Sequence, residues 1–484
     1  MYVDKINPSL TLFSDGKSYS HDDLLGLVAA WQAKFESEGL KSGDVVGFYG
    51  FLNNTSTLAS ILAALESDLK LVNIPTNYYL NPNFFSAFFG SVKLLLCTQD
   101  PSGFGVTAFK TLDITEAPDA VTTSVAVLDD SHLTDAVFTF FTSGTASDKP
   151  SIINHTHDSV LFASEQSAKN FYSADDVVIF MEGSTLNHFG ILTTTWLPAL
   201  FTANEIVFYE HYLEHGHDKG ATIVTLFDWQ NVHSTAMTEK SMLAPSARIL
   251  TGGVRLHQAA MDMFLANPNV ESVYNVYGDT TVCTPLMWKT WTREEYEALP
   301  TKSQAELNPL DKMVDGLTIE YEDTNLTSSK IIKTVQHPRF YTSDPIPVSD
   351  NITNDTPARF IGRKNLFVCV HFDDGTSHNY QPFEIDYLLS RAFNGSQFVS
   401  FKYVIDPSKK QVAHVVAHTG DDLTVDQLNA AISSFEADKK VVKIDNPFDD
   451  VMKVADFTQY NNGLKLDYVR IKADYAATRS TQAS

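Results

Sequence analysis

A hydroxyl-rich loop in the first third of the sequence is the strongest candidate for chemistry. It contains Thr142, Ser143, Gly144 and Thr145, and Lys149 follows shortly after. Hydroxyl and backbone N–H groups in such a loop donate hydrogen bonds to an anion, and glycine lets the backbone approach the ligand closely. The lysine adds a positive charge, so we expect the loop to bind a polyphosphate. An ordinary turn is the alternative, because the common phosphate motif G-x-x-x-x-G-K-S/T is absent.

Five possible metal ligands lie near one another further along the sequence. They are Glu210, His211, Glu214, His215 and His217. They lack the H-E-x-x-H order that places two histidines and a general base on one face of a helix. We therefore expect a solvated loop at this place and no metal centre.

Two histidines and a serine close to the first loop have side chains that often act in catalysis. His155 and His157 follow the loop in alternation, and we interpret both mainly as structural residues. Ser143 is not expected to be a hydrolase nucleophile, because the nucleophile elbow G-x-S-x-G is missing around it.

The composition is that of a folded, acidic protein. The chain has 484 residues, of which 43% are hydrophobic and 19% are charged, and its net charge is −24. This length predicts two or more domains. The negative charge argues against general binding of nucleic acids or anionic membranes, so a nucleotide site would need local cations.

Cysteine usage and the apolar stretches indicate the compartment. The three cysteines, Cys97, Cys283 and Cys369, lie far apart and form no C-x-x-C pair, which favours a reducing compartment. The start lacks the pattern of a signal peptide, and no apolar stretch approaches the roughly 20 residues that span a bilayer. We therefore expect a soluble, cytoplasmic protein.

Helical and strand patterns alternate over the first part of the chain. Apolar residues recur at helical spacing from Leu24 to Phe35, with Ser20 as the predicted N-cap and Gly39 as the stop. Such alternation predicts an α/β protein with mostly parallel strands. We expect strands at residues 44–49, 69–74, 92–97, 137–141, 177–181, 205–209, 221–227 and 273–276, and helices at 55–67, 188–200 and 256–266.

The pattern changes in the last third of the chain. A polar, helix-like segment at residues 301–312 precedes a region rich in strand and turn signals. We expect a smaller unit from about residue 364, with strands at 398–405, 412–418 and 441–444 and a helix at 425–437. The prediction is a large N-terminal α/β domain of layered β-sheets and helices over residues 1–362, and a small, mobile α+β domain over residues 363–484.

Short segments of glycine, hydroxyl and charged residues recur along the chain after the first loop. In order, they are residues 187–190, 251–253, 275–280, 341–344, 362–363, 382–385 and 462–467. Together with the loop at 142–145, they resemble the motifs of the adenylate-forming superfamily. This family comprises acyl- and aryl-CoA synthetases, peptide-synthetase adenylation domains and luciferases. The likeness runs through nearly the whole chain in the family's order, and the protein is identified as a divergent member.

The resemblance implies which residues hold the nucleotide. The phosphates of ATP would be bound by Thr142, Ser143, Gly144, Thr145 and Lys149. Adenine would be enclosed by Gly252, Gly253, Asn275, Tyr277, Gly278 and Thr280. The ribose would be held by Asp344 and Arg363. Lys465 would be the catalytic lysine of the mobile domain, and His188 would line the acid-binding pocket or gate the acceptor channel, with simple packing as the alternative.

The sequence departs from the family pattern at two positions that matter for catalysis. Thr281 stands where the family has a glutamate that supports magnesium, and Asp279 is the candidate substitute. An extra leucine precedes Lys465, so Lys453 and Lys472 compete with it for the catalytic role.

The activity that the resemblance implies is ATP-dependent activation of a carboxylic acid. The acid would become an acyl-adenylate with release of pyrophosphate, and the acyl group would pass to a thiol, for which coenzyme A is the expected co-substrate. ATP and Mg²⁺ are the expected cofactors. Transfer to an amine, a carrier protein or another macromolecule is one alternative. A noncatalytic nucleotide-binding scaffold is the other, because of Thr281 and because residues 146–151 read A-S-D-K-P-S where the family usually has T-G-x-P-K-G.

Overall fold

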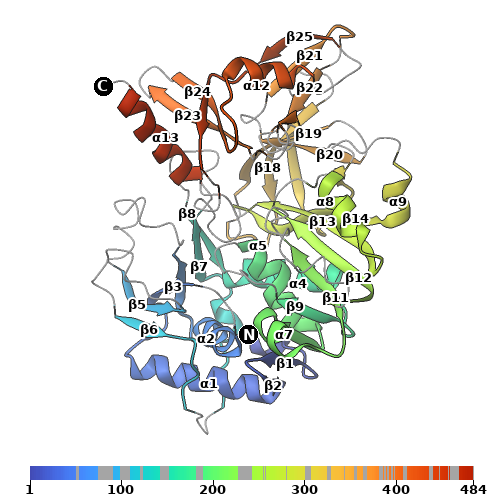
Figure 1. Ribbon diagram of the computed structural model, residues 1–484. Coiled ribbons are helices and arrows are strands. Elements are labelled where there is room, and N and C mark those ends of the chain that lie inside the picture. The colour runs from blue at the N-terminus through green and yellow to red at the C-terminus, as the bar shows by residue number, and fades with distance from the viewer. Residues whose placement is uncertain are drawn as a thin grey trace.

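The computed structural model has an α/β architecture of layered sheets and helices (Figure 1), which confirms the predicted fold class. No helix in the part of the chain that the structure describes is long and apolar enough to cross a membrane. The structure describes residues 1–50, 54–74, 91–98, 110–119, 124–141, 152–180, 189–226, 242–253, 256, 258–279, 281–299, 307–323, 329–342, 344–353, 357–363, 368–375, 377–380, 385, 389, 392–393, 396, 398–406, 411–434, 440–445, 447–455, 457 and 468–482.

The first sheet is mainly parallel and flanks the hydroxyl-rich loop. Its strand order is β6-β5-β3-β4-β7-β8, with β8 antiparallel to β7. The pairing of these two strands extends to Phe141 with Ile152, so the candidate phosphate loop connects them. The strands are β3 (Val45–Tyr49), β4 (Lys70–Asn73), β5 (Val92–Cys97), β6 (Thr111–Asp113), β7 (Ala136–Phe141) and β8 (Ile152–Thr156).

The second sheet has nine strands in the order β16-β14-β13-β12-β11-β9-β10-β1-β2. Its central strands are parallel, whereas β2, β14 and β16 run antiparallel to their neighbours. Strand β9 is buried throughout, as expected for a parallel strand covered on both faces. The strands are β1 (Thr11–Ser14), β2 (Lys17–Ser20), β9 (Val177–Phe180), β10 (Glu205–Phe208), β11 (Ala221–Leu226), β12 (Leu243–Gly252), β13 (Val270–Asp279), β14 (Cys283–Thr292) and β16 (Lys312–Met313).

Helices pack against these two sheets and share one apolar core with them. The core joins Leu62 of α2 and Phe162 of α4 to Val46, Phe138 and Ile206 of the two sheets. The helices are α1 (His21–Ser37), α2 (Thr55–Glu66), α4 (His157–Phe171), α5 (Phe189–Ile191), α6 (Leu197–Thr202), α7 (Tyr209–His215), α8 (Gln258–Ala266) and α9 (Arg293–Glu297), with short turns η1 (Val3–Lys5) and η4 (Asp130–His132) and a π-helical segment η5 (Leu192–Trp196).

Helix α1 begins at the predicted N-cap. The backbone N–H of Asp23 donates to the Ser20 hydroxyl (3.2 Å), and the backbone N–H of Ser20 donates to the Asp23 carboxylate (2.8 Å). This reciprocal capping box satisfies two backbone donors, and such a cap is worth about 1 kcal/mol.

The predicted helix at 188–200 is interrupted by the π-helical segment η5. Pro198 at the start of α6 has no N–H to donate to the preceding turn. The carbonyl of Thr194, four residues before Pro198, would accept this missing N–H in a regular helix. It accepts instead a hydrogen bond from the hydroxyl of Tyr172 (2.6 Å). A tertiary hydrogen bond therefore satisfies a carbonyl in the turn before the proline.

A third sheet, antiparallel, follows the nine-stranded one. Its order is β15-β20-β19-β18-β17, and β15 also contacts β14. The helix predicted at 301–312 does not extend beyond Leu307, which is the first described residue of this segment and is helical, because Pro309 begins a strand in which its missing N–H is tolerated. The strands are β15 (Pro309–Leu310), β17 (Thr318–Asp323), β18 (Ser329–Gln336), β19 (Ile346–Thr353) and β20 (Ala358–Arg363).

The C-terminal part forms two three-stranded sheets, which lie at the orange and red end of the ribbon in Figure 1. Their apolar cores contain only residues from Val368 onward. Strand β20 of the preceding sheet ends at Arg363, next to the predicted domain boundary. The division into domains 1–362 and 363–484 stays a prediction. The elements are β21 (Val368–Phe372), β22 (Ser377–Tyr380), β23 (Phe398–Asp406), β24 (Gln411–His418), α12 (Val425–Ile432), β25 (Val441–Asp445), β26 (Asp450–Lys453) and α13 (Tyr468–Gln482).

The solvated loop predicted at residues 210–217 is wrong, because α7 occupies most of it. His211 is buried and accepts a hydrogen bond from the backbone N–H of Gly16 (3.2 Å). His217 Nε2 lies 2.9 Å from a carboxylate oxygen of Glu205. These histidines therefore connect α7 and the turn after it to β10 and the β1–β2 hairpin.

Candidate functional site

A small cavity lies at the C-terminal end of β13, the end of a parallel strand at which ligands bind in many α/β folds. Its volume is about 110 Å³. It is lined by Gly253 after β12, by β13 from Asn275 to Asp279, by residues 308–310, and by Asp350 of β19. Pockets for whole small molecules have about 300–1,000 Å³, so this cavity fits one part of a larger ligand, such as a base or a sugar.

Tyr277 and Asp350 join two sheets at this cavity. The Tyr277 hydroxyl donates to Asp350 Oδ2 at 2.5 Å, and the side chain of Asp350 comes from the antiparallel sheet. Asp350 is only 5% exposed. A buried carboxylate is costly unless it is hydrogen-bonded, so the tyrosine holds in place an acceptor that faces the cavity.

Two asparagines fix the other side of the cavity. Asn275 Nδ2 donates to Asn308 Oδ1 (3.0 Å) and to the carbonyl of Leu307 (3.3 Å). The Asn308 amide in turn bonds both backbone groups of Leu256, with distances of 2.8 Å to its nitrogen and 2.9 Å to its oxygen. The backbone before α8 is therefore tied to β13 through side-chain amides.

Asp279 shapes the turn that follows β13. Its Oδ1 accepts hydrogen bonds from both the backbone N–H and the hydroxyl of Thr281, each at 2.7 Å. Tyr341 lies near enough to sense this carboxylate, since burial, and then the charge of Asp279, raise the pKa of the Tyr341 hydroxyl. Thr281 therefore orients the Asp279 carboxylate at the C-terminal end of β13.

The charge of the cavity limits its ligand. Two carboxylates, Asp279 and Asp350, are among its lining residues, and no lysine or arginine is among those that the structure describes there. Such a lining accepts hydrogen bonds from hydroxyl and amino groups and repels phosphate. The cavity suits a neutral, donor-rich group.

An aromatic cluster beside β7 brings together residues in or next to three of the segments that resemble family motifs. His155 of β8 is fully buried and stacks on Phe189 of α5, with ring centroids 3.6 Å apart. Tyr341 meets the His155 ring edge-on at 5.4 Å, and Phe140 of β7 meets Phe189 at 5.5 Å. Three parts of the chain are therefore neighbours: strands β7 and β8 on either side of the hydroxyl-rich loop, helix α5 next to residue 188, and Tyr341 of the segment 341–344.

The structure brings together most of the residues predicted to enclose adenine. Gly252 of β12 pairs in register with Val276 of β13, and Gly253, Asn275, Tyr277 and Gly278 line the cavity. Thr280 lies outside the described residues, as do Thr142, Ser143, Gly144, Thr145, Lys149, His188 and Lys465.

Strand pairing does not bring together Asp344 and Arg363, the two residues predicted to hold the ribose. Asp344 is exposed before β19 begins, and its backbone N–H bonds the Thr342 hydroxyl (3.1 Å). Arg363 of β20 pairs with Asp350 and not with Asp344. Asp350 and Asn308 are thus site residues that the sequence reasoning missed, and no local motif marks either of them.

The lysines that compete with Lys465 have neighbours of their own. Lys453 at the end of β26 forms a surface ion pair with Asp422 (2.7 Å). Lys472 lies on α13 and also has interaction partners. His155 and His157 are both fully buried, and the structural role predicted for them agrees with this burial.

No protein-family model matches the chain, and the comparison with curated protein sequences also gives no match. Solved structures, in contrast, match it over nearly its whole length. McyG A-PCP complexed with phenylalanyl-adenylate has a TM-score of 0.69 and 14% identity, covering 98% of this chain and 94% of that one.

Two further solved structures, both with ATP bound, give similar values. O-succinylbenzoate coenzyme A synthetase (MenE) from Bacillus subtilis, in complex with ATP and a magnesium ion, has a TM-score of 0.69 and 14% identity, covering 97% of this chain and 98% of that one. ATP-bound MatB from Rhodopseudomonas palustris has a TM-score of 0.67 and 15% identity, covering 97% and 96%. These neighbours are adenylate-forming enzymes, so the fold that the motifs predicted is confirmed, and the low identity agrees with a divergent sequence.

Proposed function

We propose that the protein activates a carboxylic acid with ATP and transfers the acyl group to a thiol, with coenzyme A as the acceptor. One observation carries the proposal. Residues that the motifs assign to adenine, Gly253, Asn275, Tyr277 and Gly278, line a single cavity in a chain with the fold of adenylate-forming enzymes.

The base and the ribose of ATP occupy the cavity in this proposal. Both present hydrogen-bond donors, which the carboxylates and amide oxygens of the lining accept. Asp350, held by Tyr277, is the buried acceptor, and Asp344 is the acceptor that the resemblance adds at the start of β19. The phosphates extend away from these carboxylates, toward the loop between β7 and β8.

The reaction joins two anions and therefore depends on cations near the phosphates. A carboxylate oxygen of the acid attacks the α-phosphorus, the bond from this phosphorus to the oxygen of the leaving pyrophosphate breaks, and the acyl-adenylate forms. Negative charge develops on the phosphoryl oxygens, and preorganised positive charges and donors stabilise it. We assign this task to Lys149, Lys465 and the hydroxyls of residues 142–145.

Magnesium accompanies ATP in this proposal, and Asp279 is the residue that would support it. Mg²⁺ prefers carboxylate oxygens and keeps several waters. Asp279 lines the cavity and is oriented by Thr281, so its carboxylate can take over from the missing glutamate. The ion would neutralise charge on the phosphates together with Lys149 and Lys465, in a protein whose net charge is −24.

The direct test is ATP–pyrophosphate exchange with a panel of short, medium, aromatic and amino acids. We expect exchange that depends on one class of acid. Lys465→Ala should abolish exchange and leave ATP binding largely intact, because the lysine acts on the phosphates. Lys453→Ala, which removes the surface pair with Asp422, tests one of the two competing lysines in the same assay and should keep the exchange activity. Equal exchange in Lys465→Ala and wild type would refute the assignment of the lysine.

A noncatalytic scaffold is the second candidate, because the Thr281 hydroxyl is engaged with Asp279. It predicts ATP binding with no exchange for any acid.

The acceptor is tested separately, by adding coenzyme A to a trapped adenylate. Failure of coenzyme A to discharge the adenylate would point to an amine, a carrier protein or another macromolecule.

A further inference from the structure

Three possible metal ligands of different kinds converge on one face of the sheet β22-β21-β25. Cys369 and His371 lie two residues apart on the central strand β21, so their side chains point to the same face. Asp445 of β25 is the register partner of Cys369. Val368, Val370 and Phe372 alternate with them and pack into the apolar core on the opposite face.

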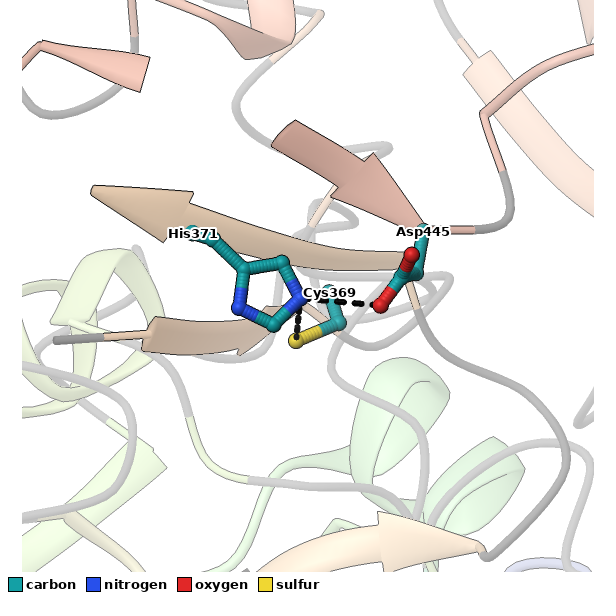
Figure 2. A group of neighbouring side chains, drawn as sticks. All are labelled: Cys369, His371 and Asp445. Atoms are coloured by element: carbon teal, nitrogen blue, oxygen red, sulfur yellow. Dashed lines mark hydrogen bonds and ion pairs between the residues drawn. The ribbon is translucent and has the colours of Figure 1, made fainter. Parts of the chain in front are cut away.

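The three ligand atoms are close together, as Figure 2 shows. His371 Nε2 lies 2.8 Å from Asp445 Oδ2 and 3.5 Å from Cys369 Sγ, and all three atoms lie within 4.8 Å of one another. The same ring nitrogen faces both partners. A catalytic Cys-His-Asp relay needs the two different nitrogens of the imidazole, so this geometry points to a shared ligand and not to an activated nucleophile.

The spacing can be compared with that of a tetrahedral zinc site. Bond lengths of about 2.3 Å for Zn–S and about 2.0–2.1 Å for Zn–N and Zn–O imply separations of about 3.5 Å between sulfur and nitrogen and about 3.3 Å between nitrogen and oxygen. The Cys369–His371 distance already fits. The Asp445 oxygen has to withdraw by about 0.5 Å from the imidazole, which is a small movement for a side chain that is 40% exposed.

Access and charge also suit a cation. The His371 and Asp445 side chains are partly exposed at 31% and 40%, whereas Cys369 is buried at 5%, so the thiol forms the floor of a site that is open on one side. Lys443 Nζ lies 2.7 Å from the other Asp445 oxygen, Oδ1. This ammonium neutralises the carboxylate in the absence of metal and would compete with an incoming cation.

We propose that Cys369, His371 and Asp445 bind one Zn²⁺ ion, with water as the fourth ligand. A thiolate, an imidazole and a carboxylate are ligands that Zn²⁺ combines in proteins. The ion fastens β25 to β21 at the solvent-accessible face and leaves one coordination position open. The site lies on residues that the proposed adenylation does not use, so the two proposals stand or fall independently.

The test is metal binding by the full-length protein after treatment with a chelator. We expect one equivalent of Zn²⁺ to bind tightly in competition with a chromophoric chelator, and Co²⁺ to give the thiolate-to-metal charge-transfer absorption of a cysteine ligand. The other group of possible ligands in the described residues, Asp68, His132 and Asp135, contains no sulfur, so this absorption distinguishes the two groups.

Variants of the ligands and of their neighbours complete the test. Cys369→Ser should remove the charge-transfer band and weaken Zn²⁺ at least tenfold, and Asp445→Asn should weaken Zn²⁺ while keeping the band. Cys97→Ala, in the first sheet, is the matched cysteine control and should change neither. Lys443→Met should tighten Zn²⁺ binding because it removes the competing charge. Wild-type protein that binds no zinc in the competition, or a charge-transfer band that survives in Cys369→Ser, would overturn the proposal.

Discussion

A single buried pair, Tyr277 and Asp350, defines the candidate site at the scale of residues. The tyrosine belongs to a segment that its resemblance to a known motif marks in the sequence, whereas the aspartate, 73 residues away, comes from a different sheet. Their hydrogen bond of 2.5 Å keeps a buried carboxylate in a cavity whose lining also includes the carboxylate of Asp279 and the amides of Asn275 and Asn308. The site is therefore specific for a ligand that can donate hydrogen bonds.

Removing the charge of Asp350 should weaken nucleotide binding. Hydrogen bonds to charged groups are worth about 1.5–3 kcal/mol, so Asp350→Asn should raise the dissociation constant of ATP roughly 10- to 150-fold by calorimetry. Tyr277→Phe should cause a smaller loss, because it only frees the carboxylate from its anchor. Asp344→Asn is the comparison: a loss confined to that variant would show that the motif, and not the cavity, locates the ribose.

At the scale of elements, the end of α2 organises the N-terminal layer of the molecule. The fully buried carboxylate of Glu66 accepts backbone N–H groups from Tyr2 (2.6 Å), Val3 (2.8 Å) and Leu128 (2.8 Å). These three donors belong to two segments, the N-terminal residues at the start of η1 and the segment that precedes η4. One side chain thus ends a helix and ties down two connecting segments.

Glu66→Gln should destabilise the protein without affecting the site directly. The amide keeps one oxygen but turns NH₂ donors toward backbone donors, and an unsatisfied buried group costs about 1–3 kcal/mol. Chemical denaturation would show this loss in the free energy of unfolding. Glu36→Gln, on the exposed surface of α1, should leave that free energy unchanged. An equal effect of the two substitutions would contradict the role of Glu66.

Local signals predicted most elements, and long-range register explains what they missed. Ser20 and Asp23 cap α1 where the sequence indicates, and the two segments predicted for adenine are adjacent strands. Asp350, by contrast, sits in an ordinary strand pattern, and only the pairing of β19 with its neighbours brings it to the cavity. Cys369 and His371 do have a local signal, the C-x-H spacing on one strand face, but Asp445 joins them only through the pairing of β21 with β25.

One predicted element was wrong and a second was predicted to extend too far, because tertiary contacts outweighed local polarity. The polar residues 210–215 form α7, in which His211 is buried against the β1–β2 hairpin. Residues near 308 look helical, but Asn308 is buried and bonded to Asn275 and Leu256. Polar side chains in these segments serve as internal hydrogen-bonding groups, which a pattern of polarity alone does not reveal.

At the scale of the whole molecule, buried histidines couple stability to pH. Burial lowers the pKa of His157, and this effect outweighs the hydrogen bond to the Asp68 carboxylate, which raises the pKa. The Tyr2 hydroxyl also contacts this ring, and Asp135 and His132 lie near enough to influence it. The neutral ring is therefore the form that the folded protein prefers.

The free energy of unfolding should consequently fall as the pH drops below about 6.5, the pKa of an unperturbed histidine. In that range the unfolded chain binds a proton that folded His157 resists, so each such group contributes a slope of up to about 1.4 kcal/mol per pH unit. Above pH 6.5 this contribution is fully present. His157→Gln should flatten the slope between pH 6.5 and 5 in urea denaturation, and an unchanged slope would exclude His157 as its source.

At the scale of the whole molecule, the central proposal is that the nine-stranded sheet and the antiparallel sheet that follows it assemble a cavity for the base and ribose of ATP. The cavity draws on the end of β12 and on β13, β15 and β19. In the proposal, its carboxylates do not directly contact the phosphates, which are bound by Lys149, Lys465 and the magnesium ion that Asp279 would support. In the proposed function, this division would allow a protein with a net charge of −24 to bind a polyanion.

Calorimetric titration of the full-length protein with ATP in the presence of magnesium tests this claim most directly. The account predicts saturable binding of one ATP per chain, with AMP competing because the cavity holds the base and ribose. No detectable binding at millimolar ATP would contradict it.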